Sequence, residues 1–169
     1  MLRLITNFLL PIFCLVVNST VFENIKLHGV RPDLFIIVVI CASVLRNDIE
    51  GAIVGFLCGL VRDIFFSNTI GFFAFLYMLV GYLCGKPFKY FYRENYFVPM
   101  ILCFVATIFF ESSVFILKFF SHNLLFYSLS AIVFPQALYN TVLILILYPL
   151  FYLLNRFIES YEIKRRKFF

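Results

Sequence analysis

Six apolar runs, each separated from the next by a short polar break, make up most of this 169-residue chain. Hydrophobic residues account for 63% of it and charged residues for only 14%, which is more apolar side chain than the interior of a soluble domain can hold. Because the excess must face lipid, we predict an all-α integral membrane protein, a bundle of six transmembrane helices. The predicted spans are residues 4–22, 32–46, 51–66, 70–86, 97–120 and 133–157, which form one domain over residues 1–158.

The placement of lysine and arginine predicts how these spans are oriented, because cytoplasmic loops carry an excess of both. With the N-terminus inside, most of the fourteen basic residues fall on the cytoplasmic side. Both termini are therefore predicted to be cytoplasmic, with residues 159–169 as a basic tail beside the anionic leaflet. The second, third and fourth runs are short for roughly 30 Å of hydrocarbon. We expect them to be packed among longer neighbours, extended by their polar flanks, or partly re-entrant.

Two of the short runs carry stripes of glycine spaced four residues apart. Small residues at this spacing stay near one face of a helix and let another helix approach closely, which favours association in lipid. We predict that the two stripes pack against each other inside the bundle; the alternative is a contact with a partner span. The stripes are Gly51, Gly55 and Gly59 in the third run and Gly81 and Gly85 in the fourth, with Gly71 closing the turn between the runs.

Charged residues lie at one end of this region. Arg31, Pro32 and Asp33 precede the second run, where proline suits a first helical turn and aspartate favours the positive end of the helix dipole. Asp63 follows the first glycine stripe at the same spacing. We predict an Arg31–Asp63 ion pair that joins the second and third helices at the outer edge of the membrane. The alternative is that solvent hydrates both charges.

Glu111 is an acidic residue near the middle of a long apolar run. A carboxyl group inside a membrane lines a cavity, contacts a partner or bonds to a neighbouring helix. Gln136, Asn140 and Thr141 on the last run are its candidate partners, and an interhelical hydrogen bond is the simplest expectation.

The sequence predicts no enzyme, metal site or cofactor. The five cysteines fall in separate apolar runs without a CxxC pair or a nearby histidine, and no Ser/His pairing or HExxH motif is present. The net charge of +5 does not form a basic stripe on a soluble face, so nucleic acid is not an expected partner, whereas the lipid bilayer is.

The order of these motifs resembles that of the rod-shape-determining protein MreD family of bacteria. The resemblance rests on Arg31-Pro32-Asp33, the apolar run after it, the glycine stripe that ends in Asp63, and Gly71; Asn140 in the last run extends it more loosely. It implies a fold like that of the six-helix substrate-binding subunits of energy-coupling-factor transporters, in the bacterial cytoplasmic membrane.

The resemblance also implies a function. Its members are scaffold subunits that bind an MreC-like partner with one span and a periplasmic domain. The implied complex contains the actin-like MreB filament, the RodA glycosyltransferase and a class B transpeptidase, and it supports rod shape and peptidoglycan synthesis along the lateral wall. The alternative is a small-molecule-binding subunit of a membrane transporter, in which Glu111 or Asn140 reads the ligand.

Overall fold

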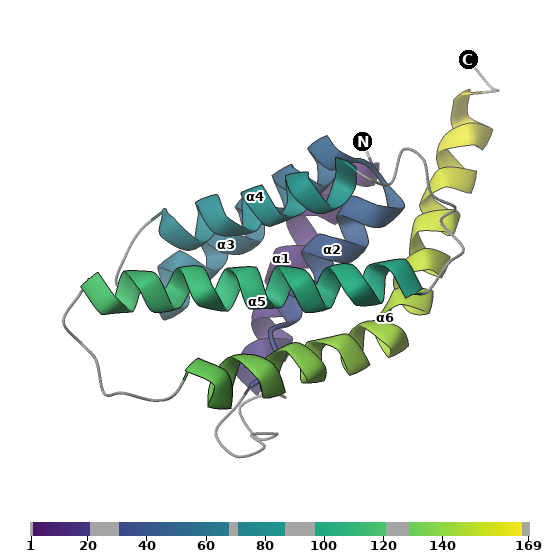
Figure 1. Ribbon diagram of the computed structural model, residues 1–169. Coiled ribbons are helices and arrows are strands. Elements are labelled where there is room, and N and C mark those ends of the chain that lie inside the picture. Colours follow the sequence, from purple (N-terminus) through teal and green to yellow (C-terminus); the bar gives the residue numbers. More distant parts are fainter. Residues whose placement is uncertain (1, 21–30, 68–70, 87–96, 121–128, 167–169) are drawn as a thin grey trace.

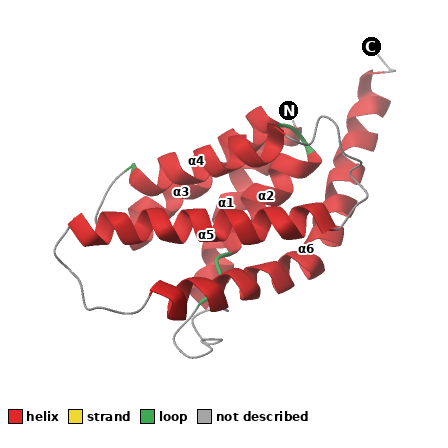
Figure 2. Cartoon of the chain, in the orientation of Figure 1, coloured by secondary structure: helices red, strands yellow, loops and turns green. Residues whose placement is uncertain are grey.

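The computed structural model describes residues 2–20, 31–67, 71–86, 97–120 and 129–166. Within these ranges it has six helices and no strand (Figure 2). Residues 21–22 and 70 of the predicted spans and residues 167–169 of the predicted tail lie outside them. The helices are α1 Leu2–Thr20, α2 Leu34–Leu45, α3 Asp48–Phe66, α4 Phe72–Gly85, α5 Phe97–Phe120 and α6 Leu129–Arg166.

Helix α2 lies at the centre of the fold. All 12 of its residues are buried, and it contacts each of the other five helices (Figure 1). Twelve helical residues rise only about 18 Å, so α2 is far shorter than α5 and α6. Because its neighbours enclose it completely, α2 is packed among longer helices, which was the first of the three expectations for the short runs.

Helices α3 and α4 lie side by side (Figure 1). Glycines of the two stripes lie at their contact. A Cβ atom added at Gly55 would collide with the carbonyl oxygen of Tyr77, and one at Gly81 would collide with the carbonyl oxygen of Gly51. One at Gly85 would meet the backbone of Asp48. The predicted internal packing of the two stripes is therefore confirmed.

The remaining three glycines of this region differ in role. A Cβ atom added at Gly51 would collide with Ser43, so Gly51 lets α2 approach α3. A Cβ atom at Gly59 would meet the backbone of Ala74, so Gly59 belongs to the α3–α4 contact. Gly71 has no atom within 4 Å of the position that a Cβ would take, but its φ is +97°, in the left-handed region. Gly71 is therefore needed for the backbone conformation just before α4 rather than for close packing.

Two helical segments, Phe97–Leu117 and Val133–Tyr161, are long and apolar enough to cross a membrane. Only 28% of each is buried, so both turn large apolar faces outward, unlike the core helix of a soluble protein. The segments Thr6–Thr20, Leu34–Leu45 and Phe72–Gly85 are apolar but shorter. Six helices thus agree with the sequence analysis, whereas six spans remain a prediction.

Helix α6 begins before the predicted span and continues through Arg166, into the segment predicted as a tail. The ribbon bends partway along, so that its first part runs beside α5 and its last part rises away (Figure 1). Pro135 and Pro149 lie inside this helix, and proline removes a backbone hydrogen bond and bends helices.

Candidate functional site

Two networks of polar side chains hold the two ends of α2. At its start, Asp33 adopts an extended backbone conformation and caps the helix: its Oδ1 accepts a hydrogen bond of 3.0 Å from the backbone N–H of Phe35. Its Oδ2 accepts from Nη1 of Arg62 on α3 and from the hydroxyl of Tyr77 on α4. Because Asp33 is only 5% exposed, both partners compensate a buried carboxylate.

Arg62 on α3 contacts three other helices at this end, α2, α4 and α5. Besides its ion pair with Asp33, its guanidinium donates to the Tyr77 hydroxyl. The guanidinium carbon also lies 4.7 Å from the ring centroid of Phe73 and 5.3 Å from that of Phe110 on α5. These distances fit cation–π contacts, which strengthen when water is excluded. Arg62 precedes the predicted residue Asp63 in the sequence but was not itself predicted.

Asn140 connects α6 to the same network. Its Oδ1 accepts a 2.9 Å hydrogen bond from the backbone N–H of Asp33, and its Nδ2 donates to Oγ1 of Thr107 on α5 at 3.3 Å. Asn140 and Thr107 are both 0% exposed. The predicted site residue Asn140 is therefore a buried link between α2, α5 and α6.

Glu111 on α5 forms a hydrogen bond to the neighbouring helix α6, which was the simplest expectation from the sequence. Nε2 of Gln136 donates to its Oε1 at 2.8 Å, which confirms one of the three candidate partners. The other two have different bonds: Asn140 contacts Asp33 and Thr107, and the hydroxyl of Thr141 donates to a carbonyl of its own helix.

Asp63 forms a contact that the sequence analysis did not anticipate. Its carboxylate accepts hydrogen bonds from the backbone N–H groups of Gly71, Phe73 and Ala74 at 2.9, 3.2 and 3.0 Å. Asp63 thus caps the start of α4, where the helix dipole also favours a negative charge. This corrects the predicted Arg31–Asp63 pair: Asp63 binds backbone amides, and the neighbouring Arg62 forms an ion pair with Asp33.

A cleft of about 300 Å³ opens beside the first turn of α2. Arg31, which is exposed, and Pro32, which is buried, form part of its wall. The polar side chains that line it come from α1, the segment before α2, α3 and α6. They are Asn18, Arg31, Asp33, Arg62 and Gln136.

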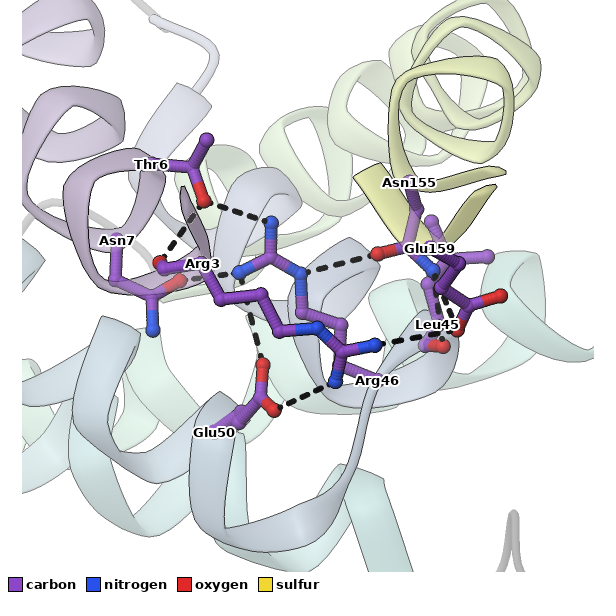
Figure 3. Close-up of polar contacts among 8 residues, drawn as sticks. All are labelled: Arg3, Thr6, Asn7, Leu45, Arg46, Glu50, Asn155 and Glu159. Atoms are coloured by element: carbon purple, nitrogen blue, oxygen red, sulfur yellow. Dashed lines mark hydrogen bonds and ion pairs between the residues drawn. The ribbon is translucent and has the colours of Figure 1, made fainter. Parts of the chain in front are cut away.

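A second network surrounds Arg46 at the other end of α2 (Figure 3). Its side chain is only 6% exposed. It donates to the amide oxygens of Asn7 on α1 and Asn155 on α6, the latter at 3.2 Å, and to Oγ1 of Thr6 at 3.3 Å. Glu50 on α3 lies 3.7 Å away and supplies a negative charge. One buried guanidinium therefore joins four helices.

Arg3 and Asn155 extend this second network (Figure 3). Arg3 donates to Glu50 at 3.2 Å and lies 3.8 Å from Glu159 on α6. Nδ2 of Asn155 donates to the carbonyl oxygen of Leu45 at 3.3 Å, and so binds one of the last carbonyls of α2. None of these residues was predicted from the sequence. The pattern that could have identified them is a set of single polar residues inside or beside apolar runs.

The described residues contain no group of three or more His, Cys, Asp or Glu side chains that could hold a metal ion. The five cysteines are free and buried. The two networks pair charges and satisfy the ends of helices.

Comparison with known proteins gives one match. The model of a family described as rod shape-determining protein MreD matches residues 1–158. The match includes the two glycine stripes, the residues that line the cleft and both polar networks except Glu159. No curated protein and no solved structure matches the chain.

Proposed function

This chain belongs to the MreD family of rod shape-determining proteins, and we propose that it is a non-enzymatic scaffold of the bacterial elongation complex. Membership supports a role in cell shape. The proposed complex contains an MreC-like bitopic partner, the MreB filament, the RodA glycosyltransferase and a class B transpeptidase. The proposed location is the cytoplasmic membrane, crossed six times, with both termini inside.

The observation that carries this proposal is the double clamping of α2. Its start is fixed by Asp33 and Arg62, and its end is fixed by Arg46. A buried, hydrogen-bonded ion pair fixes the register of helices more reliably than it adds stability. A scaffold needs one fixed arrangement of its outer faces, and a central helix held at both ends supports that need.

The outer faces suit contact with lipid and with the spans of partners. Large apolar side chains are exposed on α1, α4, α5 and α6, among them Phe13, Phe75, Phe109 and Ile146. In the proposed topology the Arg46 network lies at the cytoplasmic surface and the Asp33 network lies at the outer surface. A periplasmic partner would meet the second network, and a filament in the cytoplasm would meet the first.

Site-specific photo-crosslinking in the native host tests the partner. A photoreactive phenylalanine analogue replaces Phe13, Phe75, Phe109 or Ile146, one at a time. We expect at least one position to cross-link to the MreC-like protein, while a position on another helix cross-links to lipid alone. The proposal fails if none of the four reaches that protein while each variant still supports rod shape.

The cleft favours a second candidate function, a small-molecule-binding subunit of a transporter. Binding pockets for small ligands start at about this volume. Depletion of the protein separates the two candidates. Loss of rod shape with normal solute uptake supports the scaffold, and normal shape with impaired vitamin uptake supports the transporter.

A further inference from the structure

The last part of α6 extends past the helix that it packs against. Helix α6 has 38 residues and so rises about 57 Å, whereas the hydrocarbon of a bilayer is roughly 30 Å thick. Its first part runs antiparallel to α5, because Gln136 bonds to Glu111 and Asn140 bonds to Thr107. Continuing this register puts Phe97, the first residue of α5, level with about residue 150 of α6. Residues 150–166 therefore extend past the start of α5.

This last part of α6 crosses one end of the bundle. The amide of Asn155 bonds to the Leu45 carbonyl and to Arg46, at the end of α2. Glu159 lies 3.8 Å from Arg3, near the start of α1. In Figure 1 this part of α6 turns away from the line of α5. Because α5 is long and apolar enough to cross a membrane, a segment that turns away from it at the end of the bundle leads along the membrane surface.

The outer face of this segment is apolar. Large apolar side chains recur along it at helical spacing, and each of them is more than half exposed. They are Leu150, Leu153, Leu154, Phe157 and Tyr161, which we call the α6 stripe. Asn155 and Glu159 lie on the opposite side of the helix, against the bundle. The α6 stripe therefore faces outward, where acyl chains are more favourable neighbours than water.

Charge and aromatic residues at this end indicate the surface of an anionic leaflet. Tyr161 ends the α6 stripe, and tyrosine is enriched where a membrane meets water. Arg156 is exposed beside the stripe. From there to Phe169 the basic residues outnumber the acidic ones: Arg156, Lys164, Arg165, Arg166 and Lys167 against Glu159 and Glu162. A helix with an apolar stripe and an excess of positive charge binds best to anionic phospholipid.

We propose that residues 150–166 of α6 lie along the inner leaflet of the membrane, with the α6 stripe among the acyl chains and the basic residues at anionic headgroups. The apolar residues before the predicted basic tail thus enter lipid as well. Through Asn155, this contact ties the end of α2 to the leaflet. The inference rests on the proposed membrane location and topology, and it does not depend on the scaffold role.

Tryptophan fluorescence tests the proposal, because the chain has no tryptophan of its own and one introduced indole reports its surroundings. Phe157→Trp places the indole on the α6 stripe. Leu138→Trp, at an exposed site before the bend, is the matched control on the same helix. Each purified full-length variant is reconstituted into phosphatidylcholine vesicles with a small fraction of brominated lipid, which quenches a nearby indole. The brominated lipid is phosphatidylglycerol or phosphatidylcholine, with bromine near the headgroup or near the bilayer centre.

Depth and charge give separate expectations. Bromine near the headgroup should quench Phe157→Trp most, and bromine near the bilayer centre should quench Leu138→Trp most. Phosphatidylglycerol should quench Phe157→Trp at an about fivefold lower fraction than phosphatidylcholine, the preference that one basic residue gives at a membrane surface. The two lipids should quench Leu138→Trp alike, because its site lies away from the headgroups.

Two results would overturn the proposal. In the first, no brominated lipid quenches Phe157→Trp while Leu138→Trp is quenched, which would place the α6 stripe outside the membrane. In the second, the two lipids quench Phe157→Trp equally, so that the charge of the leaflet plays no part. If neither variant is quenched, the proposed membrane location fails together with this inference. If Phe157→Trp does not fold, Tyr161→Trp on the same stripe takes its place.

Discussion

The guanidinium of Arg62 on α3 forms an ion pair with the carboxylate of Asp33, the residue that caps α2. The carboxylate side chain is 6% exposed and the guanidinium side chain 24%. The Asp33 carboxylate also accepts a hydrogen bond from the backbone N–H of Phe35, and the backbone N–H of Asp33 donates one to Asn140. The ion pair therefore joins the start of α2 to α3, and Asn140 joins it to α6. Losing the Arg62 charge leaves the buried Asp33 carboxylate without its counter-charge.

The glycine contact between α3 and α4 makes the first prediction. We expect Gly55→Ala to lower the free energy of unfolding by about 1 to 3 kcal/mol, because the new methyl group meets the Tyr77 carbonyl and the helices must separate. The methyl group of Gly71→Ala would contact no other atom. This variant should lose only roughly 1 to 2 kcal/mol of unfolding free energy, because alanine disfavours the left-handed backbone conformation. Unfolding by SDS in mixed micelles measures both.

Gly71→Asn separates the two causes. Asparagine tolerates the left-handed region better than alanine, so it should recover part of the loss at position 71. The same residue at position 55 should be at least as damaging as alanine. Equal stability of Gly55→Ala and the unaltered protein would show that α3 and α4 are not in backbone contact.

Asp63 makes the second prediction, as the cap of α4. Asp63→Leu should cost about 1 to 3 kcal/mol, because three backbone N–H groups lose their acceptor. Asp63→Asn keeps one acceptor oxygen and should cost less. Hydrogen exchange of the Phe73 and Ala74 amides should accelerate in both variants. Unchanged exchange at these amides would show that Asp63 is not the cap.

A charge swap at the same position makes a third prediction. Because Asp63 binds amides, Arg31→Asp combined with Asp63→Arg should be no more stable than Asp63→Arg alone. Recovery of stability in the double variant, measured by unfolding in mixed micelles, would show that these two side chains do pair.

Asn155 makes the fourth prediction, at the other end of α2. Asn155→Leu removes the amide oxygen that accepts from Nε of Arg46 and the amide nitrogen that donates to the Leu45 carbonyl, so the last part of α6 should become mobile. Electron-spin distance measurements between labels at Ile49 and Tyr161, both exposed, should show a broader distribution. The five native cysteines are buried and should not take the label.

A matched control uses the exposed Leu153 on the same helix. Leu153→Ala removes side-chain volume but no hydrogen bond, and should leave the distance distribution unchanged. If Asn155→Leu behaves like this control, the Arg46 network does not hold α6 in place.

Much of the fold follows from local patterns in the sequence. Polar breaks mark the six helices, because a helix in an apolar setting ends where its backbone can meet water or polar side chains. The four-residue spacing of Gly51, Gly55 and Gly59 puts them near one face of α3. Gly55 and Gly59 meet α4 there, whereas a Cβ atom at Gly51 would meet Ser43 on α2. The same reasoning reaches part of the site: Glu111 and Gln136, on adjacent long helices, do bond.

The ion pairs could not be assigned in the same way. Asp63 continues the glycine stripe at the same spacing, so it faces α4 and reaches the amides at the start of that helix. Arg62 precedes it by one residue, about 100° around the helix, and so reaches Asp33 on α2. From the sequence alone, a pair between Arg31 and Asp63 is as reasonable as one between Arg62 and Asp33. The rotation of α3 about its axis, which its contact with α4 fixes, determines which of these pairs forms.

The central claim is that two arginines, Arg62 and Arg46, hold the two ends of α2, and a double-mutant cycle on Arg62 and Asp33 tests it most directly. Arg62→Gln alone should cost about 3 to 5 kcal/mol, because it leaves a buried carboxylate without its counter-charge. With Asp33→Asn, which keeps an acceptor for the Phe35 amide, the combined loss should fall short of the sum by at least about 1.5 kcal/mol. Losses that add to within about 0.5 kcal/mol would contradict the account.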